Sequence, residues 1–441
     1  MQILKVRVCI HKQNRDRFAK RLNGGVAIIS AAVPATRTHN MEYTYRQNSN
    51  FYYLTGFEEP NSICVIAPNH PEHQFIMFVQ PRDRDREIWD GKRVGIDGII
   101  EDFGADAGFP ISEFGEKIPD YINKTDRIYY TLDNEPLDQQ IIGFIQQNRQ
   151  TRSTKGIGPN TIIDPSEFFA EMRVTKIEEE IHRIRRATEI TADAHLAAMR
   201  VTRPEMYEYE IAALIESIYH QAEQSYPGYK TILASGQNAT ILHYVDNNQQ
   251  IKNNDLVLID SGCEYKYYNG DVTRTFPANG KFTDVQRQIY QTVLETQVEL
   301  ISMIKPGVTI DKVNKRAIRR LTEGMIKLGL LKGDTDELIK DKKYQQFYMH
   351  NVGHMLGLDV HDVSRTADGD EYRTFEPGMV MTVEPGLYVG ADSKNIDPRY
   401  LGIGVRIEDN VLVTELGNEV LTEGIPKTID EIEQVCSENQ A

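Results

Sequence analysis

The chain has 441 residues, of which 40% are hydrophobic and 26% are charged, and its formal net charge is −15. This composition excludes a disordered, collagen-like or coiled-coil protein and leaves enough apolar material for a large core. An acidic chain repels phosphate backbones, so we expect no nucleic-acid partner.

The sequence also predicts no membrane partner, because it contains no run of about 18 consecutive apolar residues. Lys5 and Arg7 interrupt the short apolar run at the start, which does not resemble a secretory signal. The cysteines lie too far apart for a thiolate metal motif, and a disulfide framework is unusual in so long a chain. They are Cys9, Cys64, Cys263 and Cys436. We therefore expect a cytoplasmic protein.

Residues 1–170 are predicted to form an amino-terminal α/β domain. Apolar runs of strand length alternate there with polar, turn-rich segments. These runs are 25–33, 62–68, 73–81 and 127–132. Gly, Pro and Asn are frequent in 153–165, which we interpret as a linker to a second domain at 171–441.

Three capping boxes predict helix starts in the second domain, at Thr175, Thr202 and Thr283. A further helix is predicted to end near Gly329. Strand-like runs follow each pair of helices, at 255–262, 270–277, 379–389 and 402–415, with a turn expected at Asn269-Gly270. Two helices and then two strands, twice, suggest a duplicated α/β half-domain.

Four acidic residues stand in or beside these apolar strands. Asp260 ends one run and Asp271 begins the next, so a hairpin could bring them together. Glu384 and Glu408 occupy similar places in the second half. Each alone could be a strand-end acid or a salt-bridge partner. Burial of carboxylates is costly unless they are paired or bind metal, so the set of four favours a cation site.

Histidines strengthen the metal hypothesis. His350, His354 and His361 fall within the segment HNVGHMLGLDVHD, and His243 is a possible fourth. No HExxH motif is present. Oxygen ligands with one imidazole and no thiolate fit Mn, Co or Zn. Four carboxylates carry more negative charge than one divalent ion needs, so we predict two cations that share a hydroxide.

These residues form a pattern that resembles a known family. The set of Asp260, Asp271, His354, Glu384 and Glu408 is similar to the five-ligand dinuclear centre of the "pita-bread" metallopeptidases. HNVGHMLGLDVHD resembles the motif that Xaa-Pro aminopeptidases and prolidases share. Segment 42–60, LIDSGCEYKYYNGDVTRTFP, VEPGLY and GVRIED resemble bacterial aminopeptidase P. The likeness covers nearly the whole chain and departs at Asn351, where the family commonly has a small residue.

The resemblance implies a duplicated pita-bread catalytic domain after the amino-terminal α/β domain. It implies a metallo-aminopeptidase that cleaves between any first residue and a penultimate proline through a metal-bridging hydroxide. Its cofactor would be two divalent metal ions, with Mn as the first expectation from this resemblance and Co or Zn as alternatives. Its partners would be peptides that have proline as their second residue. In this family the likeness also implies a homodimer or homotetramer.

The resemblance further implies a role for each site residue. Asp260 would chelate one metal, Asp271 and Glu408 would bridge both, and His354 and Glu384 would complete the ligand set of the second metal. Glu384 would also shuttle a proton to the leaving nitrogen. The remaining roles are oxyanion stabilisation by His243 and His361, and lining of the prolyl side of the cleft by His350, Tyr388 and Arg406.

Trp89, the only tryptophan, lies in a polar segment of loop texture. It could be a packing residue. The resemblance suggests instead that its loop reaches across a subunit contact to a neighbour's prolyl pocket. The first domain would then serve substrate access and oligomer contacts.

Three alternatives stay open at this point. A prolidase acting on Xaa-Pro dipeptides would use the same ligands. A catalytically inactive pita-bread module that binds peptides would typically have lost some of them. Creatinase-like enzymes share the fold without the metal set, and the intact ligands argue against that interpretation.

Overall fold

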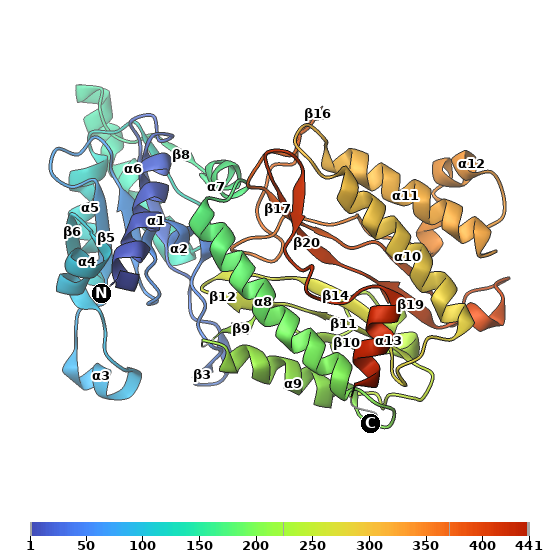
Figure 1. The fold of residues 1–441 in the computed structure, drawn as a ribbon. Helices are drawn as coiled ribbons and strands as arrows, with labels where there is room; N and C mark the ends of the chain where they lie inside the picture. Colours follow the sequence, from blue (N-terminus) through green and yellow to red (C-terminus); the bar gives the residue numbers. More distant parts are fainter. Residues whose placement is uncertain (1, 224, 370, 439–441) are drawn as a thin grey trace. The chain divides into compact units, whose positions relative to one another are not determined.

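The computed structural model describes residues 2–223, 225–369 and 371–438 (Figure 1). It divides into two compact units, Met1–Met172 and Arg173–Ala441. The structure is mixed α/β, as the sequence predicts. Within the described residues, no helix combines the length and the apolar character that membrane crossing requires.

The first unit is built on a six-stranded sheet with the order β6-β5-β4-β1-β7-β8. Its strands are β1 (Val26–Ser30), β4 (Ile63–Ile66), β5 (Phe75–Val79), β6 (Ala107–Pro110), β7 (Arg127–Tyr129) and β8 (Thr161–Ile163), and a small separate ladder joins β2 (Thr36–Thr38) to β3 (Met41–Glu42). The helices are α1 (Gln2–Ala19), α2 (Ser49–Thr55), α3 (Arg84–Asp90), α4 (Gly95–Phe103), α5 (Phe114–Ile122), α6 (Glu135–Lys155) and α7 (Ser166–Arg173).

The central strands of this sheet are buried on both faces, and alternation explains how one face meets α5 and α6. Val26 and Ile28 of β1 share a core with Ile118 of α5 and Ile141 of α6. Since successive side chains of a strand point to opposite faces, every second residue of β1 meets these helices. The linker predicted at 153–165 is wrong, because α6 continues to Lys155 and β8 completes the sheet beside β7.

The second unit contains two helix pairs and several short sheets. Its helices are α8 (Glu178–Val201), α9 (Glu208–Gln221), α10 (Asp284–Met303), α11 (Ile310–Lys327), α12 (Thr335–Lys340) and α13 (Ile429–Ser437). The strands of its first half are β9 (Tyr226–Pro227), β10 (Ile232–Ser235), β11 (Leu256–Ser261), β12 (Cys263–Tyr265), β13 (Tyr268–Asn269) and β14 (Val272–Pro277). Those of its second half are β15 (Ala367–Asp368), β16 (Glu371–Tyr372), β17 (Val380–Val383), β18 (Gly386–Val389), β19 (Ile403–Arg406), β20 (Asp409–Val413) and β21 (Asn418–Val420).

Both helix pairs pack on the strands of this unit. In Figure 1 the strands lie between the green pair α8–α9 and the gold pair α10–α11. One core joins Ala187 of α8, Ile215 of α9, Val257 of β11, Val293 of α10 and Leu321 of α11. The predicted order of two helices and then strands therefore occurs twice.

Two of the three predicted capping boxes are wrong. Helix α8 begins after Ile177, whose N–H donates to Glu180 at 2.9 Å, so Thr175 lies before the cap. Thr202 follows the last residue of α8 and does not start α9. The box at Thr283 is confirmed. Apolar periodicity located these helices. The exact first residue of each helix depended on which acidic side chain accepts a hydrogen bond from a backbone N–H at the helix start.

The turn predicted at Asn269-Gly270 is also wrong. Tyr265 pairs with Tyr268, so Lys266 and Tyr267 form the two-residue turn between β12 and β13. Both have positive φ, 47° and 71°, as a type I′ hairpin turn requires. An Asn-Gly pair is the stronger sequence signal for such a turn, but here Asn269 belongs to β13.

Candidate metal centre

Regular strand pairing brings the two aspartates together. Asp260 of β11 lies opposite Thr273 of β14, and Asp271 directly precedes β14. The hydroxyl of Tyr229 lies 2.6 Å from Asp260 Oδ1 and 2.5 Å from Asp271 Oδ1. A Cβ atom at Gly262 would lie 1.8 Å from the carbonyl oxygen of Gly270, so only glycine permits this close approach of the two backbones.

Both glutamates lie at breaks in runs that the sequence analysis treated as single strands. Glu384 and Pro385 separate β17 from β18, and proline cannot donate to a strand ladder. Glu408, with Ile407, separates β19 from β20. Its Oε2 accepts a hydrogen bond from Thr273 Oγ1 at 2.7 Å. The breaks release these side chains from the alternation of a continuous strand.

The side chain of His354 faces the carboxylates of one aspartate and one glutamate. Its Nε2 lies 3.4 Å from Asp271 Oδ2 and 3.6 Å from Glu384 Oε1. Nδ1 lies 3.1 Å from the carbonyl oxygen of Met355. This carbonyl fixes the proton of the neutral ring on Nδ1, so the Nε2 lone pair points toward the acids. A Cβ atom at Gly353 would lie 2.0 Å from the carbonyl oxygen of Thr382, so glycine allows the His354 segment to run close along β17.

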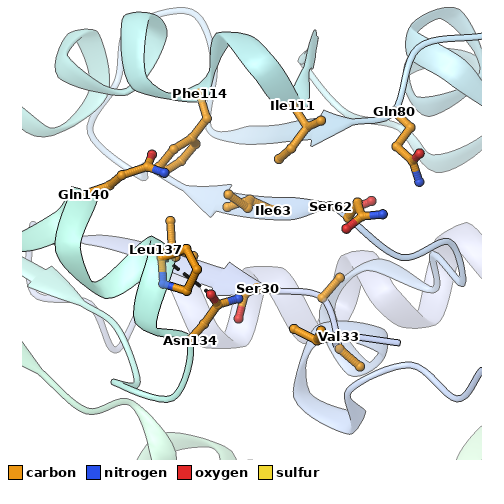
Figure 2. Close-up of a pocket in the computed structure, with 14 residues that line it drawn as sticks. Ser30, Val33, Ser62, Ile63, Gln80, Ile111, Phe114, Asn134, Leu137 and Gln140 are labelled. Atoms are coloured by element: carbon orange, nitrogen blue, oxygen red, sulfur yellow. Dashed lines mark hydrogen bonds between the residues drawn. The ribbon is translucent and has the colours of Figure 1, made fainter. Parts of the chain in front are cut away.

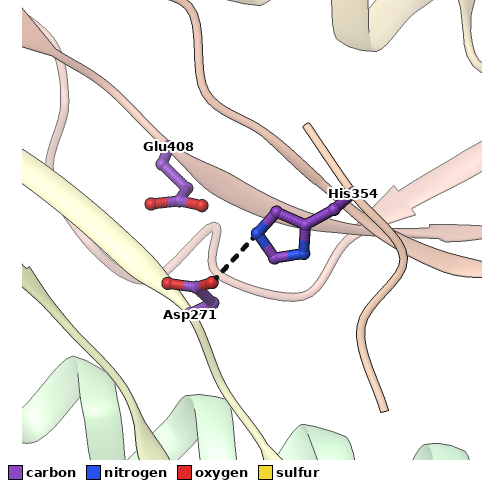
Figure 3. A group of neighbouring side chains, drawn as sticks. All are labelled: Asp271, His354 and Glu408. Carbon is purple, nitrogen blue, oxygen red and sulfur yellow. Dashed lines mark ion pairs between the residues drawn. The ribbon is translucent and has the colours of Figure 1, made fainter. Parts of the chain in front are cut away.

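The five predicted ligands therefore form one connected cluster. Asp271, His354 and Glu408 offer ligand atoms that all lie within 4.8 Å of one another, and Figure 3 shows their side chains pointing toward a common centre. Asp260 joins this group through the shared Tyr229 hydroxyl, and Glu384 joins it through His354.

The electrostatics of the cluster fit cations. Burial raises the pKa of Glu384 to about 7 and raises the pKa values of Asp260 and Glu408, with the neighbouring acids adding to the effect. Burial lowers the pKa of His354, but the hydrogen bond and charge of Asp271 outweigh it and raise that pKa to about 9. The acids thus have too little positive charge around them. Divalent cations supply such charge, so this donor set suits hard or borderline metal ions.

The residues predicted for the prolyl side form a hydrogen-bonded group beside the acids. The hydroxyl of Tyr388 lies 2.9 Å from His350 Nε2 and accepts a hydrogen bond from Arg406 Nη1 at 3.1 Å. Arg406 also donates to Asp260 Oδ2 at 2.6 Å. This buried guanidinium is therefore fixed against a predicted ligand.

The two predicted oxyanion residues lie on irregular segments. The ring of His361 meets the ring of His354 edge to face at a centroid distance of 4.2 Å. Burial and the nearby charges of His354 and His243 lower the pKa of His361. Both His243 and His361 are exposed. Trp89 has 85% of its surface exposed and belongs to the helix α3, so the predicted loop is wrong at this point.

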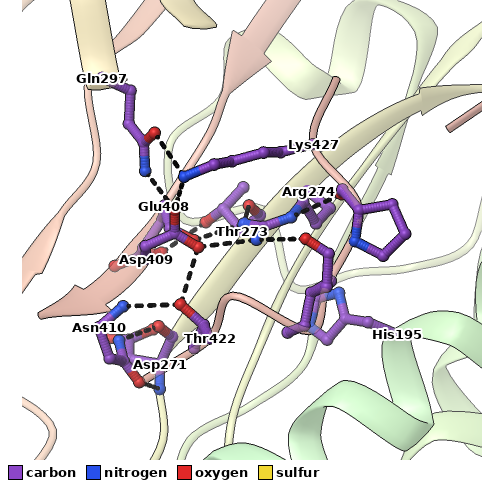
Figure 4. A network of polar contacts seen from close by, with 12 residues as sticks. His195, Asp271, Thr273, Arg274, Gln297, Glu408, Asp409, Asn410, Thr422 and Lys427 are labelled. Atoms are coloured by element: carbon purple, nitrogen blue, oxygen red, sulfur yellow. Dashed lines mark hydrogen bonds and ion pairs between the residues drawn. The ribbon is translucent and has the colours of Figure 1, made fainter. Parts of the chain in front are cut away.

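Several residues that support the ligands were missed by the sequence analysis. Asn410 accepts from the Asp271 N–H at 3.1 Å and donates to the Asp271 carbonyl oxygen. Arg274 donates to Asp409 at 2.7 Å and to the Glu408 carbonyl oxygen at 2.6 Å (Figure 4). Asp409 and Asn410 directly follow the predicted ligand Glu408, and this position in the sequence could have indicated that they support the site. Tyr229 offered no such signal.

A pocket of about 380 Å³ in the first unit has a different character (Figure 2). Its lining includes Ile63, Phe114 and Leu137, with uncharged polar residues such as Gln80 and Asn134. No titratable side chain is among the residues that line it. It therefore offers no acid, base or metal ligand of the kind that the second unit assembles.

Comparisons with known proteins agree with this division. Residues 182–415 match the model of metallopeptidase family M24, and residues 11–129 match that of the aminopeptidase P N-terminal domain. The chain is 43% identical to the Xaa-Pro aminopeptidase of Escherichia coli over 93% of each chain. It superposes on Pseudomonas aeruginosa aminopeptidase PepP with a TM-score of 0.95 (40% identity, 98% of each chain). For Zn-substituted Escherichia coli aminopeptidase P in complex with product, the TM-score is 0.93 (41% identity, 98% of this chain and 99% of that one).

Proposed function

This chain belongs to metallopeptidase family M24, and we propose that it uses divalent cations to remove the first residue from peptides whose second residue is proline. It is a metallo-exopeptidase of the Xaa-Pro aminopeptidase type, with the expected fold of an amino-terminal domain and a pita-bread catalytic domain. A prolidase and an inactive binding module are not favoured. The observation that carries the proposal is the connected cluster of four carboxylates and one imidazole.

We propose that the cluster holds two cations. Asp260 would bind one, His354 and Glu384 would bind the other, and Asp271 and Glu408 would bind both. The shared contact of Tyr229 with both aspartates and the 4.8 Å cluster support this assignment. When bound, the cations supply the charge that activates water at neutral pH and polarises the scissile carbonyl.

The chain's own residues supply proton transfer and orientation. Glu384 would carry a proton to the leaving nitrogen, because cleavage of an amide requires that nitrogen to be protonated. His361 and His243 would stabilise the oxyanion from their exposed segments. His350, Tyr388 and Arg406 would bind the prolyl side.

Finer points of the proposal concern the metal and the assembly. Manganese is the proposed native ion, with Co and Zn as alternatives, because oxygen donors dominate the site. Cys64, Cys263 and Cys436 are buried free thiols, which suits a reducing cytoplasm.

We propose a homodimer or homotetramer in which residues 1–170 provide subunit contacts and control substrate access. Trp89 would then close over a neighbour's cleft.

The test combines metal analysis with two substrates. We expect two divalent ions per purified chain and faster hydrolysis of an Xaa-Pro-Yaa tripeptide than of an Xaa-Pro dipeptide. Exclusive cleavage of the dipeptide would favour a prolidase. Absence of both turnover and bound metal, with the fold intact, would overturn the proposal.

A further inference from the structure

A buried ion-pair cluster stands directly beside His361. Asp362 accepts hydrogen bonds from Arg173 Nη2 and from Lys176 Nζ, the latter at 3.0 Å. Arg173 also donates to Asp359 at 2.6 Å. The side chains of Arg173, Lys176 and Asp362 are only 1–2% exposed.

Such a cluster is a poor way to gain stability alone. Desolvation of buried charges is costly, and apolar replacements of equal volume are often as stable. Here the two cations outweigh the effect of burial and hold the pKa of Asp362 below its usual value, so the carboxylate is ionised. An ionised carboxylate that is held by two cations in a fixed geometry can keep the neighbouring backbone segment in one position.

The segment from His354 to Asp362 has that requirement. The Asp362 N–H donates to the Met355 carbonyl oxygen at 2.9 Å, which closes the segment into a loop. A Cβ atom at Gly357 would lie 2.4 Å from Asp362 Oδ2, so the carboxylate packs against the loop that it closes. His361 itself is exposed, and its ring meets the ring of His354. Its placement therefore depends on its neighbour in the chain.

We propose that Asp362, which is ion-paired with Arg173 and Lys176, is a positioning residue that fixes His361 over the reacting carbonyl. It acts through His361 and does not itself touch substrate. This inference rests on the proposed function, because it assumes that His361 stabilises the oxyanion.

The main test is a double-mutant cycle on Xaa-Pro-Yaa hydrolysis. We expect Asp362→Asn to lower kcat by at least about 10-fold with KM and bound metal unchanged, within the ~10²–10³-fold loss expected for His361→Ala. If Asp362 acts through His361, adding Asp362→Asn to His361→Ala will lower kcat no further. Independent, multiplying losses would overturn the proposal, as would an unchanged kcat.

A matched control separates position from stability. Glu433 is another buried acid, 8% exposed, paired with Lys281 and Arg287. Glu433→Gln is expected to lower Tm and leave kcat unchanged. Lys176→Met keeps the Arg173–Asp362 pair and provides a milder variant if Asp362→Asn does not fold. It should also lower kcat without metal loss, and normal kcat in this variant would contradict the proposal. If the wild-type protein fails to cleave Xaa-Pro-Yaa, the proposed function fails instead.

Discussion

The aspartates and the glutamates reach one cluster by different backbone routes. Asp260 and Asp271 come from the β11–β14 pairing, where the strand register sets the distance between two short side chains. Glu384 and Glu408 come from breaks between strands, where longer side chains reach in. A register slip of one residue would turn Asp260 to the opposite face, whereas no ladder sets the direction of the glutamates. The aspartate side is therefore defined by pairing and the glutamate side by irregular backbone.

The largest expected effect is the loss of one ligand from either side. Asp271→Ala and Glu384→Ala should each reduce turnover far beyond the ~10–100-fold cost of losing an outer partner, because each removes a direct ligand. Turnover, metal content and circular dichroism would be measured together. Near-normal activity with two metals per chain, in either variant, would contradict the dinuclear mechanism.

A smaller effect is expected from the supporting residues of each side. Asn410→Ala leaves the N–H and the carbonyl of Asp271 without their partner, so metal affinity should fall about 10–100-fold. Thr382→Ala should cost less, because its bond to Glu384 is long, 3.3 Å, although the variant also removes the acceptor of the His354 N–H at 3.0 Å. Metal titration of both variants tests this order. Asn418→Ala is the control, since Asn418 bonds to carbonyls at the end of α10 and should affect only Tm.

The pH dependence should reflect the glutamate side. In protein stripped of metal, Glu384 has its pKa raised from 4.5 to about 7, and His354 from 6.5 to about 9. Both groups bind more protons in the folded state, so the free energy of unfolding falls as pH rises. The His354 contribution is complete below pH 6.5 and is lost through about 9, and ionisation of Glu384 destabilises the fold from 4.5 through about 7. Metal must displace these protons, so affinity and activity should instead rise with pH.

Two measurements check this reversal. The Tm of the protein from which a chelator has removed the metal should fall between pH 5 and pH 8. Glu384→Gln should make this fall smaller, because glutamine does not titrate. Activity should decrease on the acid side. A profile that stays flat down to about pH 5, below the ordinary histidine pKa of ~6.5, would count against it.

The smallest structural effect is expected for Trp89, which serves as a reference outside both ligand groups. Its side chain is 85% exposed, so Trp89→Ala should change stability by less than about 0.5 kcal/mol. If it closes over a neighbour's cleft, KM for Xaa-Pro peptides should rise while metal content stays constant. Unfolding several degrees earlier with unchanged kinetics would identify it as a structural residue.

The sequence predicted regular structure better than irregular structure. Alternating apolar runs located β1, β4 and β5, and helical periodicity located α10 and α11. The aspartate hairpin followed from the spacing of Asp260 and Asp271. The breaks at Glu384 and Glu408 were missed, because apolar residues continue on both sides and periodicity alone does not reveal an interrupted ladder.

Long-range contacts account for most of what was missed at the site. Tyr229 and Asn410 touch the ligands through the tertiary fold, and neither carries a local pattern. The family resemblance grouped the five ligands. The contacts of Arg406 and His354 with the acidic ligands could not be predicted, because these distances depend on how separate segments pack.

The close backbone approaches at Gly262 and Gly353 limit how this enzyme can change by mutation. Alanine at either position would place a methyl group about 2 Å from a carbonyl oxygen, so even the smallest replacement forces strands apart. In a saturation library screened for new peptide preferences, both positions should therefore tolerate as few substitutions as the ligands do. Diversity is better directed to the exposed segment around His243, where side chains can vary without moving the strands.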